Sequence, residues 1–295
     1  MISWETFILL IVASVLFFIV PSFFFGHRLA RPKRSAISQT PETVNLNYCD
    51  ISFSTEDNSA IKAWRIPSRS KTITVVVPGF GINKSNLMDI IKPMYDAGLD
   101  LLVIDLRGQG EGADGPCTYG INESLDVLSA IKWIRSNNDT KDKPISVFGF
   151  SVGASAALLA STKTEDISAL IIDSAIYDFK LTTKMALKKM FGLIGTLFVP
   201  ITIQFYSKFA NVNANRLNFV DSAHWLKAKK ILMIHGEKDR VSDISLANAA
   251  FEKIKIKKEI WITDSEHTHA FFDHQAKYIL RVTDFIKQTA STPTI

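Results

Sequence analysis

The sequence predicts an α/β protein with a mostly parallel central sheet that is flanked by helices. Two observations support this prediction. Short apolar runs of strand length alternate with segments of helical periodicity, and several of these runs end in glycine-containing turns. An uncharged apolar segment precedes this region, and a long apolar insertion interrupts it. With 295 residues, the chain is long enough to bury a full core.

The uncharged apolar segment runs from Phe7 to Phe25. Its length is close to the roughly 20 residues that a helix needs to cross a bilayer core, and a membrane helix tolerates a proline such as Pro21. A cleaved signal peptide is the competing interpretation. Signal peptides carry positive charge before the apolar run, whereas Glu5 is the only charged side chain there. We therefore predict a transmembrane anchor over residues 1–27.

Positive charge follows the anchor. The basic side chains there are Arg28, Arg31, Lys33 and Arg34. They belong to a segment with Ser and Pro that predicts a linker over residues 28–43. Positive flanks stay on the cytoplasmic side of a membrane, so we expect the domain over residues 44–291 to be cytoplasmic. The net charge is +5, but the other basic residues are spread along the chain, so no nucleic-acid partner is expected.

The domain over residues 44–291 contains alternating strands and helices. The predicted strands are Val44–Phe53, Ala60–Ile66, Thr72–Val77, Leu101–Ile104, Ile145–Phe150, Ala169–Ile172, Ile231–Ile234 and Ile260–Thr263. The predicted helices are Ile121–Arg135, Ala154–Ala160 and His274–Thr289. The first two strands form a hairpin, and the alternation after them is typical of a parallel sheet with helices on both faces.

One connection breaks this alternation. Residues 174–230 separate two predicted strands and are rich in Met, Phe, Leu and Ile. Connections of this length inside a compact domain are usually functional or form a subdomain. We predict a helical cap over the carboxyl edge of the sheet, where open α/β folds bind ligands.

Ser151 is the predicted nucleophile. It lies between a predicted strand and a predicted helix, in the segment Gly149-Phe150-Ser151-Val152-Gly153. A sharp strand–turn–helix connection exposes a serine hydroxyl above the sheet. Glycines on both sides of Ser151 remove the Cβ atoms that would clash where the two backbones pass. The helix that follows presents its N-terminus to a developing anion.

A serine nucleophile needs a base, and the base needs an orienting acid. In strand–turn–helix hydrolases the acid follows the serine in the chain, and the histidine follows the acid. Asp239 lies in the turn after Ile231–Ile234 and is the predicted acid. Glu237 and Asp243 in the same region, and Asp173 after the preceding strand, remain open alternatives.

The base is expected after the last predicted strand. His267 and His269 both lie in that loop, with His274 further on, and spacing alone does not choose between the first two. His235 ends a buried strand and is expected to hold the acid loop by hydrogen bonding.

Acyl transfer also needs donors for the oxyanion. The first expected donor is the backbone N–H of Val152, directly after the nucleophile. The second is the N–H of Phe80, in the turn Pro78-Gly79-Phe80-Gly81 after the Thr72–Val77 strand.

From about Thr72 to Ile286 the chain resembles an α/β-hydrolase of the serine-aminopeptidase-like and monoglyceride-lipase-like branch. It is most similar to membrane-anchored α/β-hydrolase-domain proteins. The resemblance rests on the Ser151 pentad and on three further segments in order, which are Asp105–Gly112, Tyr119–Asp126 and His235–Asp239. It implies the α/β-hydrolase fold and a Ser-Asp-His triad.

The resemblance also favours His267 over His269 as the base. The family's last loop often reads His-Thr-x-Ala with a Tyr eleven positions after the histidine, and His267 and Tyr278 fit that register. The sequence departs from the family at Pro78, where a His is usual, at Glu266, where a Gly is usual, and at Ser242, where a Pro is frequent. None of these departures removes a triad member.

The expected function is a membrane-anchored hydrolase of carboxylic esters that acts through a covalent acyl-enzyme. No cofactor is implied, and Cys49 and Cys117 have no metal-ligand spacing. The anchor and the apolar cap favour a lipid or long-chain acyl substrate. The same triad serves peptidases and thioesterases, and a non-catalytic membrane-tethered binding protein is the alternative outside enzymes. The sequence makes no prediction of oligomeric state.

Overall fold

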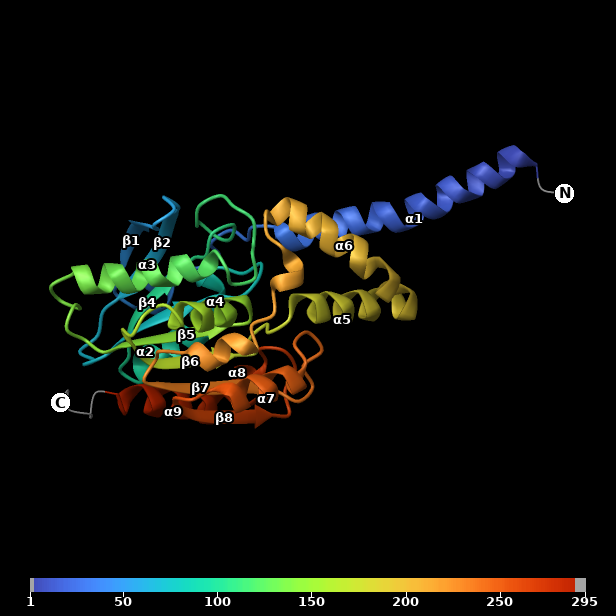
Figure 1. The fold of residues 1–295 in the computed structure, drawn as a ribbon. Helices are drawn as coiled ribbons and strands as arrows, with labels where there is room; N and C mark the ends of the chain where they lie inside the picture. Colours follow the sequence, from blue (N-terminus) through green and yellow to red (C-terminus); the bar gives the residue numbers. More distant parts are fainter. Residues whose placement is uncertain (1–2, 290–295) are drawn as a thin grey trace.

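The computed structural model describes residues 3–289, and eight strands in this part of the chain form one sheet (Figure 1). The strand order is β1-β2-β4-β3-β5-β6-β7-β8. The strands are β1 (Cys49–Ser54), β2 (Ala60–Ile66), β3 (Ile73–Val77), β4 (Asp100–Ile104), β5 (Ile145–Phe150), β6 (Ile167–Asp173), β7 (Lys230–Gly236) and β8 (Lys257–Thr263). Strands β3 to β8 pair in parallel, and only the pairs β1–β2 and β2–β4 are antiparallel. The predicted mostly parallel sheet, with a hairpin at its start, is confirmed.

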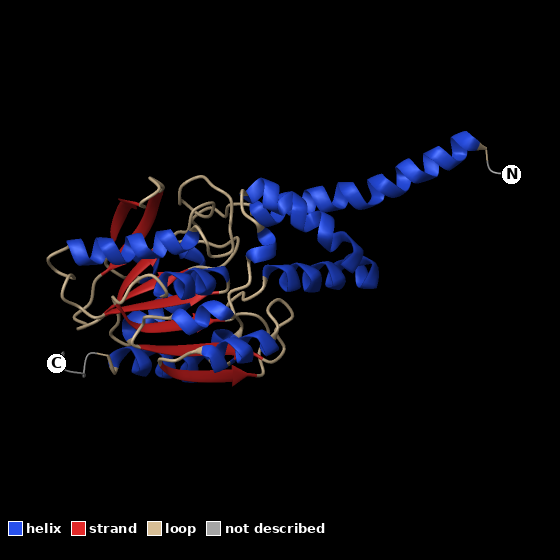
Figure 2. Ribbon diagram, viewed as in Figure 1, coloured by secondary structure: helices blue, strands red, loops and turns tan. Residues whose placement is uncertain are grey.

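Helices cover both faces of the sheet (Figure 2). The α-helices are α1 (Trp4–Ala30), α2 (Met88–Asp96), α3 (Glu123–Ser136), α4 (Val152–Ser161), α5 (Phe179–Phe191), α6 (Gly195–Ala210), α7 (Ile244–Lys253), α8 (Ala270–Asp273) and α9 (Gln275–Lys287). Short 3₁₀ segments are η1 (Pro41–Val44), η2 (Lys84–Leu87), η3 (Gly192–Ile194), η4 (Ala214–Arg216) and η5 (Asp221–Trp225). Buried side chains of α3, α4 and α7 pack in one apolar cluster, and those of α2, α8 and α9 pack in a second. The sheet lies between these two clusters.

The first predicted strand begins too early. Pro41–Val44 forms the 3₁₀ segment η1, Asn45 adopts a left-handed backbone with φ 57°, and β1 starts only at Cys49. The apolar residue Leu46, which suggested strand alternation, is buried in the core from an irregular segment. Helices α2 and α7 were not predicted individually. Pro93 inside α2 weakens its helical signal, since an internal proline removes a backbone hydrogen bond.

The N-terminal apolar segment forms one long helix that continues to Ala30, beyond the predicted end of the anchor at residue 27. Its first half projects away from the domain, whereas its last turn packs into it (Figure 1). Ala30 is fully buried, and its carbonyl accepts a hydrogen bond from Cys117 N–H at 2.7 Å. Residues 1–2 of the predicted anchor and residues 290–291 of the predicted domain lie outside the described part of the chain.

The predicted cap region contains a hairpin of α5 and α6 that projects from the sheet beside α1 (Figure 1). The chain reverses at Gly192, which has φ 66°, and the two helices then pack tightly. A Cβ atom on Gly195 would lie 2.1 Å from the Leu187 carbonyl oxygen. Helix α1 also packs closely on α6, because a Cβ on Gly26 would lie 2.7 Å from Phe205 Cβ. The cap is therefore attached to the N-terminal helix as well as to the sheet.

Candidate active site

Ser151 lies in a strained turn between β5 and α4. Its backbone has φ 51° and ψ −114°, a conformation that non-glycine residues rarely adopt. The turn is possible because glycines flank it. A Cβ on Gly153 would lie 2.3 Å from the Pro78 carbonyl oxygen, and a Cβ on Gly149 would lie 2.4 Å from the Gly153 carbonyl oxygen. Packing on both sides therefore holds the serine in its strained conformation at the carboxyl end of β5.

Ser151, His267 and Asp239 form one chain of hydrogen bonds. His267 Nε2 lies 2.8 Å from Ser151 Oγ, and His267 Nδ1 lies 2.7 Å from Asp239 Oδ2. The three residues follow β5, β8 and β7, whose carboxyl ends meet at the same edge of the sheet. A neutral imidazole with its proton on Nδ1 donates to the carboxylate and accepts the serine hydroxyl at Nε2. This is the arrangement of nucleophile, base and orienting acid in serine hydrolases.

The Asp239 carboxylate is held in its ionised form. Burial raises its pKa, but the hydrogen bond from His267 and the N–H groups of Ser242 and Val241 outweigh burial and hold the pKa below its ordinary value. The two N–H groups donate to Oδ1 at 2.9 and 2.8 Å, which leaves Oδ2 free for His267. His235 Nε2 lies 3.0 Å from the Ser242 carbonyl oxygen, so this histidine holds the acid loop.

The alternative acids point elsewhere. Glu237 is exposed, and Asp243 caps α7 by accepting from Ser245 N–H at 2.8 Å. Asp173 is fully buried, and its carboxylate accepts the hydroxyl of Tyr278 at 2.6 Å and that of Ser174 at 2.8 Å. Burial raises the pKa of Asp173 despite these two donors.

The alternative histidines have other surroundings as well. His269 is exposed, and its ring lies against Phe272, 5.8 Å between centroids. His274 Nε2 lies 2.8 Å from Asp264 Oδ1 on the surface. Among the three histidines after β8, His267 is the one that the structure brings to Ser151.

The two predicted oxyanion donors lie beside the nucleophile. Val152 is the first residue of α4, and Phe80 follows Gly79, where a Cβ atom would lie 3.3 Å from Ser151 Cβ. Within residues 3–289, the N–H groups of Phe80 and Val152 donate to no protein acceptor. The two N–H groups are thus available to donate hydrogen bonds to the oxyanion that forms when the serine attacks a carbonyl.

Gln109 supports the turn that carries Phe80, a role that sequence reasoning missed. Its Oε1 accepts a hydrogen bond from Gly81 N–H, and its side chain is buried. The bond thus joins the turn that follows Pro78 to the loop after β4. The available signal was the position of Gln109 inside the Asp105–Gly112 segment, whose role was not deduced.

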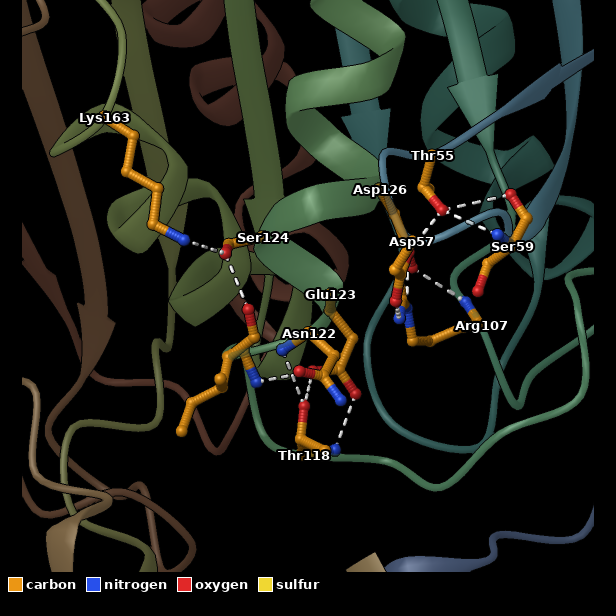
Figure 3. A network of polar contacts seen from close by, with 12 residues as sticks. Thr55, Asp57, Ser59, Arg107, Thr118, Asn122, Glu123, Ser124, Asp126 and Lys163 are labelled. Atoms are coloured by element: carbon orange, nitrogen blue, oxygen red, sulfur yellow. Dashed lines mark hydrogen bonds and ion pairs between the residues drawn. The ribbon is translucent and has the colours of Figure 1, made fainter. Parts of the chain in front are cut away.

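Polar side chains of the Asp105–Gly112 and Tyr119–Asp126 segments form a network of hydrogen bonds (Figure 3). Arg107 donates to Asp126 at 2.6 Å and to Asp57 at 2.5 Å. Glu123 accepts hydrogen bonds from Thr118 N–H at 2.7 Å and Gly120 N–H at 2.9 Å. These bonds thus brace the loops of both segments, and Tyr119 from the second one also lines the cavity at Ser151.

A cavity of about 430 Å³ opens at Ser151 and His267. Its other walls are mostly apolar and include Leu29, Phe80, Ile82, Leu87, Ile90, Tyr119, Phe150, Ile176, Ala186, Val241 and Phe272. Thr182 and Ala186 belong to the cap helix α5, whereas Leu29 belongs to α1. The contribution of α1 was not predicted, because it depends on how the last turns of this helix pack on the domain.

The fold and the site define the class of the protein, which is an α/β-hydrolase. More narrowly, residues 68–225 match the serine aminopeptidase S33 family, and the chain belongs to that family. The matched region includes Ser151 and the segments Asp105–Gly112 and Tyr119–Asp126, and it ends before Asp239 and His267.

The chain is similar to Bem46 of Schizosaccharomyces pombe, with 24% identity over 68% of this chain and 64% of Bem46. It is also similar to the polyketide transferase GrgF of Penicillium, with 25% identity over 44% of this chain and 45% of that protein. The alignments thus span less than two thirds of either relative.

Two solved structures share the fold. The esterase Pf2001 of Pyrococcus furiosus has a TM-score of 0.74 and 24% identity over 88% of this chain and 98% of its own. A membrane phospholipase A has a TM-score of 0.62 and 15% identity over 98% of both chains.

Proposed function

We propose that this protein is a membrane-anchored serine hydrolase that cleaves carboxylic esters. The hydrogen-bonded chain from Ser151 through His267 to Asp239 carries the proposal, because it supplies a nucleophile, a base and an orienting acid in the required order. The two unused N–H groups beside Ser151 and the apolar cavity support it.

In the proposed reaction, Ser151 Oγ attacks the acyl carbonyl carbon while His267 Nε2 takes the serine proton. Asp239 keeps the imidazole oriented and stabilises the imidazolium. The N–H groups of Phe80 and Val152 donate to the oxyanion. The leaving alcohol then takes the proton from His267, which leaves an acyl ester on Ser151.

Water completes the cycle. It attacks the acyl carbon while His267 Nε2 takes its proton. The proton then passes to Ser151 Oγ as the carboxylic acid leaves. The apolar walls of the cavity favour an acyl chain as the part of the substrate that is bound.

Helix α1 is the proposed anchor. It is 27 residues long, has a mean hydropathy of 2.8 over its most apolar window and exposes most of its side chains. A helix of this length exceeds the bilayer core, which is roughly 20 residues thick. The basic residues after it favour a cytoplasmic hydrolase domain.

An activity-based probe tests the nucleophile. We expect a fluorophosphonate to label the wild-type protein and the Ser151→Ala variant to remain unlabelled. Ser136→Ala, which removes an exposed hydroxyl at the end of α3, is the matched control and should label like the wild type. Labelling of both serine variants, or of neither, would contradict the assignment of Ser151.

Protease treatment of sealed vesicles tests the orientation. With the cytoplasmic side outward, the domain should be digested without detergent. Protection of the domain until detergent is added would reverse the proposed topology.

A further inference from the structure

The end of the cap hairpin carries a group of apolar side chains that project from the protein. We call this group the cap tip, and its members are Met190, Phe191, Leu193, Ile194 and Leu197. Leu193 is 75% exposed and Leu197 is 58% exposed. Adjacent apolar side chains exposed at one point of a fold mark a surface that contacts another apolar phase.

The cap tip lies against the part of α1 that is proposed to cross the membrane. Phe198, directly after the tip, packs on Phe17 and Phe18, with ring centroids 5.7 and 5.2 Å apart. Phe191 in the tip packs on Phe25 at 5.6 Å. In Figure 1 α6 runs from the tip to α1, whose N-terminal half continues well beyond the contact.

The packing of the cap on α1 determines how deep the cap tip lies in the membrane. The uncharged segment of α1 ends at Phe25, and Phe17 and Phe18 lie within it. At 1.5 Å per residue, the helix from Phe7 to Phe25 covers about 27 Å, nearly the full thickness of a bilayer core. When this segment of α1 spans the core, Phe198, which packs on Phe17 and Phe18, lies inside the core as well. The cap tip directly precedes Phe198 and therefore reaches the hydrocarbon.

The hairpin is not a second membrane span. Phe179–Ala210 is apolar enough to cross a membrane by length and composition, but the chain reverses at Gly192 and forms two antiparallel helices. The charges on α5 suit partial insertion. Lys184, Lys188 and Lys189 are exposed just before the tip, where their ammonium groups would reach the phosphates of a bilayer that holds the tip.

The cavity at Ser151 adjoins the elements that enter the membrane. Ala186 in its wall is one helical turn before Met190 in the tip, which is about 6 Å along α5. Leu29, which also lines the cavity, lies one turn after Phe25 in α1. The wall of the cavity and the cap tip are therefore one helical turn apart along α5, so the cavity would open next to the bilayer.

We propose that the cap tip inserts into the lipid bilayer beside α1 and opens the cavity to it, so that the substrate is a bilayer-resident acyl ester. The insertion rests on the proposed membrane anchor α1 and on its packing with α6. The substrate class also rests on the proposed function of Ser151. The two parts are therefore tested separately.

Fluorescence quenching tests the insertion. In a Cys49→Ser background, Leu193→Cys and Leu280→Cys each provide one reactive site for an environment-sensitive dye, because Cys117 is fully buried. The full chain is reconstituted in vesicles that contain nitroxide-labelled lipid. We expect the label at position 193 to be quenched by the nitroxide and protected from aqueous iodide. The label at position 280, on the exposed face of α9, should show the opposite pattern.

Two outcomes would overturn the insertion. Iodide quenching at position 193 as strong as at position 280 would place the tip in water. Protection from iodide without nitroxide quenching would show that protein, such as a second copy of the chain, covers the tip. Neither readout depends on catalysis, so an inactive Ser151 would not affect them.

Paired kinetics test the substrate class. The variant Leu193→Ser/Ile194→Ser/Leu197→Ser should hydrolyse a long-chain ester in vesicles about tenfold more slowly, because three apolar side chains leave the hydrocarbon. Its rate on a short, water-soluble ester should match the wild type, which also reports correct folding.

The matched control is Trp225→Ser/Leu280→Ser, which removes exposed apolar side chains elsewhere on the domain. It should leave both rates unchanged. Equal rates of wild type and tip variant on both esters would overturn the role of the tip in substrate access, and so would an equal loss on both esters.

Discussion

Gln109 accepts the backbone N–H of Gly81, and this bond joins the loop after β4 to the turn that carries Phe80. The Gln109 amide nitrogen has no hydrogen-bond partner among residues 3–289, so the acceptor oxygen is the group through which the side chain acts. Gly81 has φ 73° and directly follows Phe80. The bond thus limits the movement of the N–H group that is proposed to bind the oxyanion.

Replacing Gln109 with methionine should reduce catalysis more than stability. Gln109→Met keeps the shape of the side chain and removes the acceptor. We expect kcat on a soluble ester to fall about ten- to hundredfold with KM little changed, a smaller loss than removal of an oxyanion donor itself. Steady-state kinetics and the thermal midpoint measure the two effects. A variant with unchanged kcat would show that the turn needs no support from Gln109.

Because Asp239 orients His267, a conservative substitution of Asp239 should strongly reduce kcat. Asp239→Asn keeps the size of the side chain but favours the wrong imidazole tautomer. On this basis kcat should fall by about 10³- to 10⁴-fold. Asp243→Asn is the matched control, since asparagine also caps a helix, and it should stay close to the wild type. A comparable loss in both variants would indicate general disruption of the loop.

The packing of α1 on the cap depends on a glycine. Gly26→Leu places a side chain where Phe205 Cβ and Tyr206 N would lie 2.7 and 2.8 Å from the new Cβ. Overpacking of this kind costs about 1–3 kcal/mol. We expect a lower thermal midpoint of the full chain in detergent and faster proteolysis of α1 and of the cap helices, because their contact is loosened. Ala13→Leu, at an exposed position of the same helix, should have neither effect.

The ion pair of Asp57 with Arg107 predicts a pH-dependent contribution to stability. The hydrogen bond from Arg107 lowers the pKa of Asp57 from 3.8 to about 2. A carboxyl whose pKa is lower in the folded state stabilises the fold above its unfolded pKa and loses this contribution as the pH falls through the folded value. Because its side chain is 42% exposed, the contribution is screened to about 1 kcal/mol.

The measurement is the thermal midpoint of Asp57→Asn against the wild type across pH. Asp57→Asn should be less stable above pH 3.8, and the difference should disappear as the pH approaches 2. The control is Glu56→Gln at the exposed neighbouring position, where no such difference is expected. A difference between Asp57→Asn and wild type that stays constant across this range would contradict the assigned cause.

The central elements could be predicted from sequence because their signals are local. The strand Ile145–Phe150 was predicted with its observed bounds, since a buried strand reads as a continuous apolar run that a turn ends. The start of β1 was misplaced because Leu46 is buried without belonging to a strand. Local patterns report burial, and they do not distinguish a strand from an irregular segment that packs on the core.

The sequence by itself determined the mostly parallel sheet, the long apolar N-terminal helix and the turn that exposes Ser151, because periodicity and glycine spacing act over a few residues. The sequence favoured Asp239 and, through the family resemblance, His267, but only the tertiary structure brought both to Ser151. Only the tertiary structure also decided that Gln109 supports the Phe80 turn and that α1 forms a wall of the cavity. These relationships join residues far apart in the chain, and their distances depend on how the sheet and the cap bring separate segments together.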